Sequence, residues 1–308
     1  MTDNFFSYDQ INRRQFGHRL ATATAAGAWL TQARVTQSKP DYVAEVPFKL
    51  SVMLWTIYKN LGFEQRLERA AQAGYRAVEL VDEFKKWSRD DFRRANARKR
   101  SLGITFDATA GVWKSLADPQ QRDAFLADLQ TFFSTAVELE CPAIIVLSGD
   151  LVPNLSRQQQ HDSCIEGLKR AADLAAQRNI TLLLENIDPE ENPKYYLTSV
   201  AEGFEIVKKV DNPHVRFLYD FYHEQIAEGN LIEKLQKNIN LVGLLHVADV
   251  PGRHAPGTGE INYGNIFRQL AELKFDGYVA MEFLPETDPV SELRSARELA
   301  LQSARGHS

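Results

Sequence analysis

Short apolar runs alternate with longer amphipathic segments along most of the chain, beginning at Lys49. Runs of four to six residues that are apolar at almost every position are typical of parallel strands buried on both faces. Eight such runs follow one another, at residues 50–55, 77–81, 104–107, 143–147, 181–184, 215–219, 241–245 and 278–281. Their onsets recur about every 33 residues, which is close to the length of one strand–helix–strand unit.

The segments between these runs carry helix signals. Asp118 followed by Pro119 predicts an N-cap and a first helical position. Ser156 with Gln159 predicts a capping box ahead of a long amphipathic stretch. Gly74 is placed to end the helix that follows the first apolar run.

Eight strand–helix units in about 250 residues predict an α/β fold of the (β/α)8 TIM barrel type. We expect this barrel to occupy residues 48–300. A doubly wound sheet is the alternative, but it would need a glycine-rich phosphate-binding loop after an early strand. The sequence after the early runs has no such loop.

The first 47 residues differ from the rest of the chain. Arg13 and Arg14, followed by Gln15 and Phe16, resemble the start of a twin-arginine export signal. An uncharged stretch, residues 20–30, is too short to span a bilayer but suits the apolar region of a signal peptide. We therefore expect residues 1–47 to be a signal and linker and the protein to be exported to the periplasm. The alternative is an N-terminal tail with a chance arginine pair on a cytoplasmic protein.

Composition and charge narrow the possible partners. Hydrophobic residues make up 44% and charged residues 25% of the chain, which argues against a disordered or collagen-like protein. The formal net charge of −5 makes a nucleic-acid partner unexpected. No apolar run reaches the 18 or so residues of a spanning helix, so we expect no stable membrane insertion. Cys141 and Cys164 are too few for a disulfide framework, and we expect two buried thiols.

Four ionisable side chains stand directly after apolar residues in the second half of the chain: Glu185, Asp220, His246 and Glu282. The carboxyl ends of barrel strands meet at one mouth, so these groups are expected to converge. Carboxylates about 4 Å apart repel by roughly 4 kcal/mol per pair at an effective dielectric constant near 20. Each carboxylate could instead pair with a lysine or arginine, but one divalent cation would offset the repulsion among all three carboxylates. Mostly oxygen ligands favour Mn²⁺, Mg²⁺ or Co²⁺.

These residues resemble the xylose isomerase-like barrels. The four strand ends match that superfamily's metal pattern of Glu, Asp, His or Gln, and Glu, and residues 220–223 match its Asp-x-x-His step. The segments at residues 251–256 and 259–263 nearly match the hydroxypyruvate isomerase branch, and the resemblance covers roughly residues 49–285. That branch often has Gln where this chain has His246, whereas ketose 3-epimerases have His.

The resemblance implies an aldose–ketose type of isomerase with one divalent ion on the four strand-end residues. Glu185 and Glu282 would act as the catalytic acid and base that move a proton through an enediolate. The expected substrate is a small keto acid or sugar, with hydroxypyruvate giving tartronate semialdehyde as the first choice. A ketose 3-epimerase and an exported sugar-binding barrel without turnover are the alternatives, and the oligomeric state, a homo-oligomer included, stays open.

The resemblance also implies substrate contacts by His223, Arg253 and Glu191. A guanidinium at position 253 could hold a carboxylate through two parallel hydrogen bonds. Trp55, at the end of the first run, could line the pocket or belong to the core, and the same choice stands for Glu79 in the second run. An apurinic-site endonuclease of the same superfamily would need extra histidines near the ends of the earlier strands, and this sequence has none there.

Overall fold

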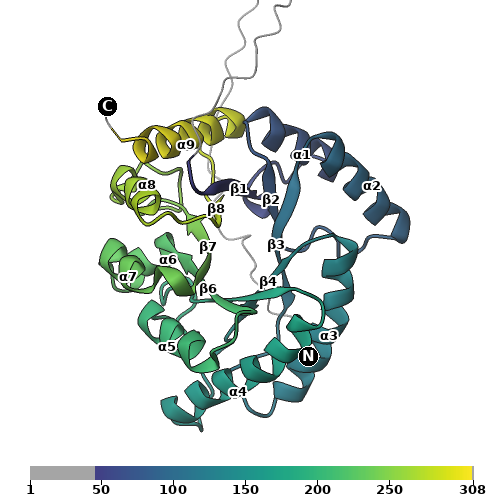
Figure 1. Cartoon of the computed structure of the whole chain (residues 1–308), viewed down its shortest axis with the longest axis vertical. Helices are drawn as coiled ribbons and strands as arrows, with labels where there is room; N and C mark the ends of the chain where they lie inside the picture. Colours follow the sequence, from purple (N-terminus) through teal and green to yellow (C-terminus); the bar gives the residue numbers. More distant parts are fainter. Residues whose placement is uncertain (1–45, 307–308) are drawn as a thin grey trace, which may run out of the picture. The chain divides into compact units, whose positions relative to one another are not determined.

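The eight apolar runs form eight parallel strands in chain order, and the last strand pairs with the first to close a barrel. This computed structural model describes residues 46–306 (Figure 1). The predicted (β/α)8 TIM barrel is confirmed. The strands are Lys49–Met53 (β1), Ala77–Leu80 (β2), Thr105–Val112 (β3), Ala143–Leu147 (β4), Thr181–Glu185 (β5), Val215–Asp220 (β6), Val242–Val247 (β7) and Tyr278–Met281 (β8).

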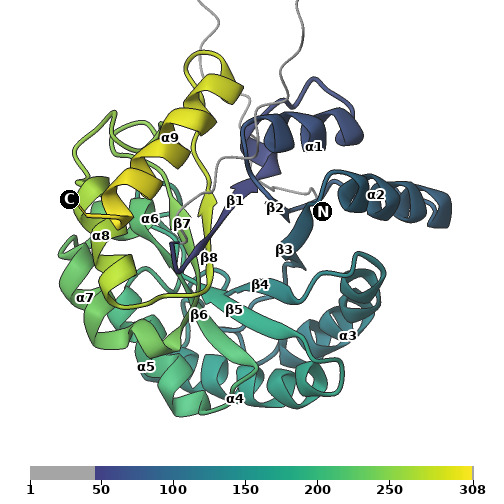
Figure 2. The same ribbon diagram turned by 45° about the horizontal axis from the view of Figure 1, so that its top comes forward.

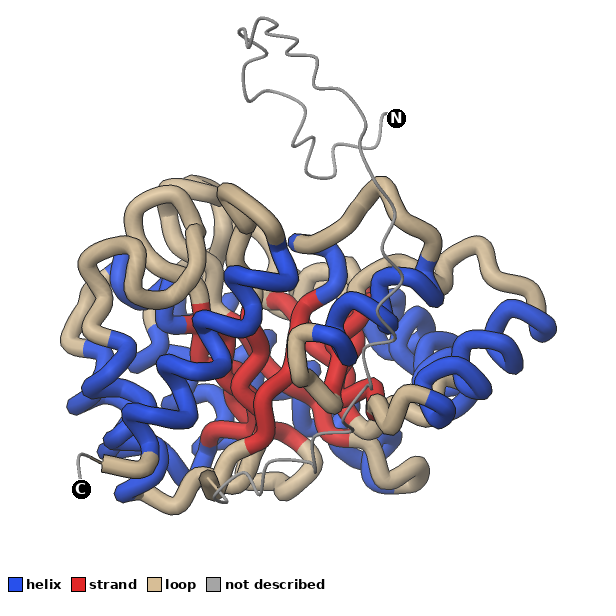
Figure 3. The backbone as a smooth tube through the Cα atoms, turned by 90° about the horizontal axis from the view of Figure 1, so that it is seen from above, coloured by secondary structure: helices blue, strands red, loops and turns tan. Residues whose placement is uncertain are grey.

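Helices surround the strands, as the ribbon in Figure 2 and the tube in Figure 3 both show. The α-helices in the described residues are Phe63–Gln72 (α1), Arg89–Ser101 (α2), Arg122–Glu138 (α3), Arg157–Ala176 (α4), Val200–Val210 (α5), Phe221–Ala227 (α6), Leu231–Asn238 (α7), Tyr263–Glu272 (α8) and Pro289–Ala304 (α9). Within the described residues, two short 3-10 helices, Leu54–Thr56 and Ile239–Leu241, precede α1 and β7.

Two of the three predicted helix signals were right and one was wrong. Gly74 directly follows Ala73, the C-cap of α1, and has a φ of +95°. Ser156 and Gln159 form the expected capping box at the start of α4, each side chain bonding to the other's backbone amide. Asp118 does not cap α3, which begins at Arg122. Its carboxylate instead accepts from the amide of Gln120 and closes a turn, because a short polar side chain can bond locally and compete with helix formation.

Apolar side chains fill two regions. The larger lies between strands and helices, whereas the inside of the barrel holds a small cluster: Met53, Ala108, Ala110, Ala143, Ile145, Leu183, Leu218 and Leu244. Buried polar groups accompany the inner cluster. Ser51 on β1 donates from its hydroxyl to Asp107 on β3 at 2.7 Å, which places a carboxyl group deep among the strands.

The structure agrees with some of the remaining sequence expectations and differs from others. Strand β3 runs on to Val112, beyond the apolar run that predicted it, and Trp55 lies in the 3-10 helix after β1. Cys141 and Cys164 are buried free thiols, as expected. The signal and linker predicted for residues 1–47 lie, apart from the last two residues, outside the described part of the chain. Within residues 46–306 no helix is both long and apolar enough to cross a membrane.

Candidate active site

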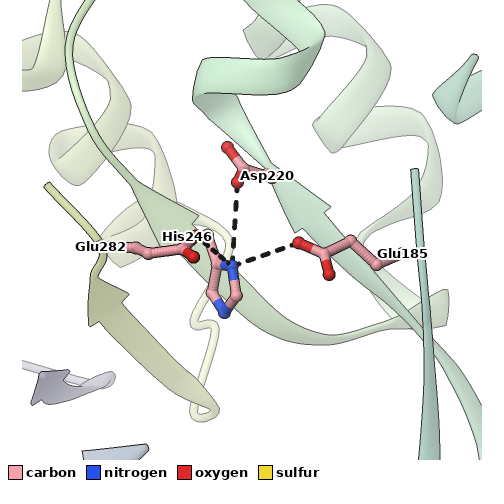
Figure 4. Close-up of side chains that lie close together, drawn as sticks. All are labelled: Glu185, Asp220, His246 and Glu282. Carbon is pink, nitrogen blue, oxygen red and sulfur yellow. Dashed lines mark ion pairs between the residues drawn. The ribbon is translucent and has the colours of Figure 1, made fainter. Parts of the chain in front are cut away.

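The four predicted ligands lie together at the carboxyl ends of the last four strands. Glu185 ends β5, Asp220 ends β6, His246 is the last but one residue of β7, and Glu282 directly follows β8. The strand register places Asp220 beside His246, so these residues share one edge of the barrel. All four are buried, and one ligand atom from each lies within 4.8 Å of the others (Figure 4).

The Nδ1 atom of His246 is the centre of this cluster. It lies 2.8 Å from Oε2 of Glu282, 3.3 Å from Oε1 of Glu185 and 3.7 Å from Oδ2 of Asp220 (Figure 4). Three of these buried atoms, Nδ1 of His246, Oε2 of Glu282 and Oδ2 of Asp220, have no partner with hydrogen-bond geometry among the described residues. Buried polar atoms without hydrogen bonds are unusual and costly, so their convergence fits a site that holds a cation.

Glu79 holds the other side of the histidine ring. Its two carboxylate oxygens lie 3.0 and 3.2 Å from Nε2 of His246, and the side chain is fully buried. A carboxylate that accepts from one ring nitrogen leaves the other nitrogen free to bind a metal. Sequence reasoning left Glu79 undecided. Its only local signal is a charge inside an apolar strand, and nothing local shows that β7 lies opposite.

A second buried carboxyl group, Asp107, lies in the barrel interior. Burial and the nearby Glu79 raise its pKa to about 8, against the smaller effect of the Ser51 hydroxyl. Its Oδ2 atom has no hydrogen-bond partner among the described residues. Sequence reasoning read Asp107 only as part of the third strand and missed its place beneath the site.

Arg253 connects three of the predicted site residues. One guanidinium nitrogen, Nη1, donates to both carboxylate oxygens of Glu191 at 2.9 and 3.1 Å, and Nη2 lies 2.8 Å from Oε2 of Glu282. The ring of Trp55 lies 5.6 Å from the guanidinium carbon, and its Nε1 donates to Oε1 of Glu282 at 2.9 Å. Burial opposes ionisation of Glu282, but Arg253 and His246 outweigh it and lower its pKa to about 2.

A single carboxylate shapes the loop that carries Arg253. Asp249 accepts hydrogen bonds from four backbone amides between 2.8 and 3.0 Å, those of residues 250, 257, 259 and 261. Gly259 is required there, because a Cβ atom would lie 2.1 Å from the carbonyl oxygen of Val250. Arg253 itself has a φ of +58°, in the left-handed region, which its surroundings must maintain. The loop therefore presents the guanidinium in a fixed place.

His223 contacts the cluster directly, and Glu191 is connected to it through Arg253. Nε2 of His223 is 3.5 Å from Oδ2 of Asp220, and its Nδ1 is 2.6 Å from Oδ2 of Asp188. Asp188, Glu191 and His223 form a second group close enough to share an ion. In that group Nδ1 of His223 is already engaged by Asp188. All eight predicted site residues therefore lie in one connected network, whose chemical roles stay a prediction.

Burial and charge act in opposite directions within the cluster. Burial is the main cause that raises the pKa of Glu185, and the nearby Glu282 adds to it. Burial would also raise the pKa of Asp220, but His223, His246 and Arg253 lower it well below its usual range. Burial lowers the pKa of His246, yet Glu79 and Glu282 outweigh burial and raise it well above its usual value. The cluster thus attracts positive charge.

Comparison with known proteins identifies the family of the chain. The xylose isomerase-like TIM barrel family matches residues 67–302. A 2-oxo-tetronate isomerase from Pectobacterium atrosepticum is 29% identical over 241 residues, covering 77% of this chain and 92% of the relative. A hydroxypyruvate isomerase from Escherichia coli is 28% identical over 251 residues, covering 80% of this chain and 97% of the relative.

A solved structure shares the fold. A crystal structure described as AP endonuclease, family 2, from Brucella melitensis has a TM-score of 0.74 and 26% sequence identity, and covers 81% of this chain and 98% of that one. The family match spans well over half of the chain. The two relatives named above are isomerases, and the match covers almost their whole length. The chain is therefore an isomerase that belongs to the xylose isomerase-like TIM barrel family.

Proposed function

We propose that this isomerase depends on a divalent metal and interconverts an α-hydroxy ketone and the matching aldehyde through an enediolate. The observation that carries the proposal is the position of Glu185 and Glu282. Their carboxylates approach the same nitrogen of His246 from β5 and from the end of β8, which are not neighbouring strands. A substrate held between them has one carboxylate to remove a proton beside its carbonyl group. The other carboxylate returns a proton at the adjacent carbon.

The donor set of the cluster fits a divalent cation. Glu185, Asp220 and Glu282 supply oxygen ligands and His246 supplies one imidazole nitrogen, a mostly hard set that suits Mn²⁺, Mg²⁺ or Co²⁺. When bound, such an ion would act as a Lewis acid on the substrate's carbonyl and hydroxyl oxygens and stabilise the enediolate charge.

The surrounding residues keep the two catalytic carboxylates in place. Trp55 and Arg253 each contact Glu282, so its carboxylate has a fixed position and stays ionised. Two backbone amides, those of Tyr222 and His223, donate to Oδ1 of Asp220 and turn its Oδ2 toward the cluster. Such preorganised groups need no rearrangement when charge develops on the substrate.

For the substrate we propose a short hydroxylated 2-oxo acid, with hydroxypyruvate giving tartronate semialdehyde as the first choice. The names of the relatives support this class, because both hydroxypyruvate and 2-oxo-tetronate belong to it. Arg253 would bind the substrate carboxylate. The residue is 5% exposed, so a charge-assisted hydrogen bond there is shielded from water.

A ketose 3-epimerase is the second candidate, and one observation favours it. The Arg253 guanidinium already bonds to Glu191 and Glu282. An incoming carboxylate would have to displace Glu191, whereas a sugar hydroxyl could donate to Glu191 and leave that ion pair intact. A neutral ketose therefore demands less rearrangement of this network.

A substrate panel tests both candidates. The purified protein is stripped with EDTA, reloaded with Mn²⁺, Mg²⁺ or Co²⁺, and incubated in D₂O with hydroxypyruvate, a 2-oxo-tetronate and neutral ketoses. We expect metal-dependent turnover of a 2-oxo acid with deuterium entering at the carbon next to the carbonyl group. Turnover of ketoses alone would replace our first choice with the epimerase. Binding without any exchange would contradict catalysis at this site.

A further inference from the structure

The loop between β5 and α5 contains a buried carboxylate that the proposed chemistry does not use. Asp188 is completely buried. Its Oδ1 accepts from the backbone amides of Glu190 and Glu191, both at 2.9 Å, and its Oδ2 lies 2.6 Å from Nδ1 of His223. One carboxylate therefore touches the two residues that face the candidate substrate site from this side.

The contact at Oδ2 determines which ring nitrogen of His223 carries a proton. An ionised carboxylate only accepts hydrogen bonds, so a contact of 2.6 Å requires a proton on Nδ1. The backbone amide of Asp188 also approaches Nδ1, at 3.3 Å, but a protonated Nδ1 cannot accept from it. The shorter contact, which involves a charge, is the stronger of the two. Nε2 is then the atom of His223 that faces the cluster, 3.5 Å from Asp220.

The contacts at Oδ1 fix the start of the segment that carries Glu191. Two consecutive amides bonded to one oxygen form a tight turn of the kind that Asp favours. The turn places the Glu191 carboxylate against Arg253, where both its oxygens lie within 3.1 Å of Nη1. Oδ1 of Asp188 thus holds the segment that carries Glu191, and Oδ2 holds the ring of His223.

From this geometry, and resting on the isomerase function proposed above, we propose that Asp188 is a positioning residue that sets the ring tautomer of His223 and the location of Glu191. His223 then presents Nε2 to a substrate oxygen, and Glu191 presents its carboxylate beside Arg253. Burial alone would raise the pKa of Asp188, but His223 and the amide of Glu191 lower it, so the carboxylate that this role needs is maintained.

An asparagine cannot replace this carboxylate. The three groups that meet Asp188 are all donors: two backbone amides and the Nδ1–H of His223. Asparagine has one accepting oxygen and one donating amino group. If its oxygen keeps the two backbone amides, its amino group faces Nδ1 and displaces the proton from that nitrogen. His223 then no longer donates from Nδ1, so the contact that orients its ring toward the cluster is lost.

The test compares Asp188→Asn with the wild-type protein by ¹⁵N NMR of the histidine rings and by kinetics. The chain has seven histidines, so the His223 signals can be assigned by their loss in His223→Gln. We expect the proton to move from Nδ1 to Nε2 in Asp188→Asn. We also expect kcat/KM to fall about 10- to 100-fold, as is usual when the partner of a functional histidine is lost. Metal content should not change, because Asp188 contacts none of the four cluster residues.

A matched control and a double variant separate this role from a merely structural one. Asp150→Asn makes the same chemical change at an exposed residue that contacts Asn192 of the same loop, and it should leave both readouts unchanged. In the His223→Gln background, Asp188→Asn should have almost no further effect, because the two residues act as one unit. If Asp188→Asn does not fold, Asp188→Ser serves the same comparison, since its hydroxyl accepts from the amides but cannot hold the Nδ1 proton as a carboxylate does.

Two results would overturn the assignment: an unchanged His223 tautomer in the position 188 variant, or an equal loss of kcat/KM in the presence and absence of His223. Failure of the proposed function is a different result. In that case the wild-type protein would turn over no substrate of the panel, while the NMR comparison would still decide whether Asp188 sets the His223 tautomer.

Discussion

Replacing Asp107 by Asn should stabilise the metal-free protein, and the gain should grow with pH. In the folded protein the pKa of Asp107 is raised from 3.8 to about 8, mainly by burial. The folded state therefore holds the proton more tightly than the unfolded chain does. The contribution of Asp107 to the stability of the folded protein is therefore fully present at low pH, and it is lost as pH rises toward the pKa of Asp107 in the folded state. Asparagine stays neutral, so it avoids this loss.

The structure sets the size of the effect. A shift from 3.8 to about 8 is roughly four pKa units, or close to 6 kcal/mol at most once the group ionises in both states. Roughly 2 kcal/mol of this is already lost at about pH 5, and roughly 5 kcal/mol at about pH 8. The stability difference between Asp107→Asn and wild type should therefore widen by up to about 3–4 kcal/mol over this interval. Asn can still accept the Ser51 hydroxyl bond, and its amino group replaces an oxygen that has no hydrogen-bond partner in residues 46–306.

Urea unfolding in EDTA, followed by far-ultraviolet circular dichroism at both pH values, measures this difference. Asp173→Asn, the same change at an exposed position of α4, is the matched control and should show no widening. A constant difference between Asp107→Asn and wild type across the pH range would refute the reasoning. Asp107 would then be ionised in the folded protein at about pH 5, where its burial would have to be compensated by another group.

Three further predictions concern the metal, the substrate and export. Glu185→Gln or Asp220→Asn should each remove the metal from an otherwise folded protein, and stoichiometric metal in both variants by elemental analysis would contradict the site. Arg253→Ala should lower kcat/KM for hydroxypyruvate about 30- to 1,000-fold, a loss of roughly 2–4 kcal/mol, with Arg253→Lys recovering only part because it lacks the planar fork. Replacing Arg13 and Arg14 by Lys should keep the protein in the cytoplasm. If cell fractionation finds the wild type and this variant in the same compartment, the export proposal is wrong.

The fold was predictable because parallel barrel strands are buried on both faces. Strand β5 illustrates this, since Leu182, Leu183 and Leu184 are all buried and read as one apolar run. The position of Glu185 at its end followed directly, and the barrel topology alone brings the ends of β5 to β8 together. Helix starts were less predictable. Asp118 carried a good N-cap signal, but its side chain stabilises a local turn instead.

The residues that orient the site could not be assigned from the sequence in the same way. Glu79 and His246 are 167 positions apart and meet only because the barrel closes. Asp188 lies in an acidic loop, where one buried carboxylate cannot be distinguished from its exposed neighbours by pattern alone. Strand ends are local features, whereas hydrogen bonds between distant elements depend on the complete fold.

The candidate metal ligands all come from the ends of the last four strands, but two of their supports come from β2 and from just after β1. Trp55, just after β1, donates to Glu282 after β8, and Glu79 on β2 accepts from His246 on β7. A folding intermediate made of β5 to β8 alone would have every ligand and neither support. A bound ion stabilises only those states that bind it. Because the two supports hold the ligands in place only in the closed ring, divalent ions should favour the closed ring over an open half-barrel.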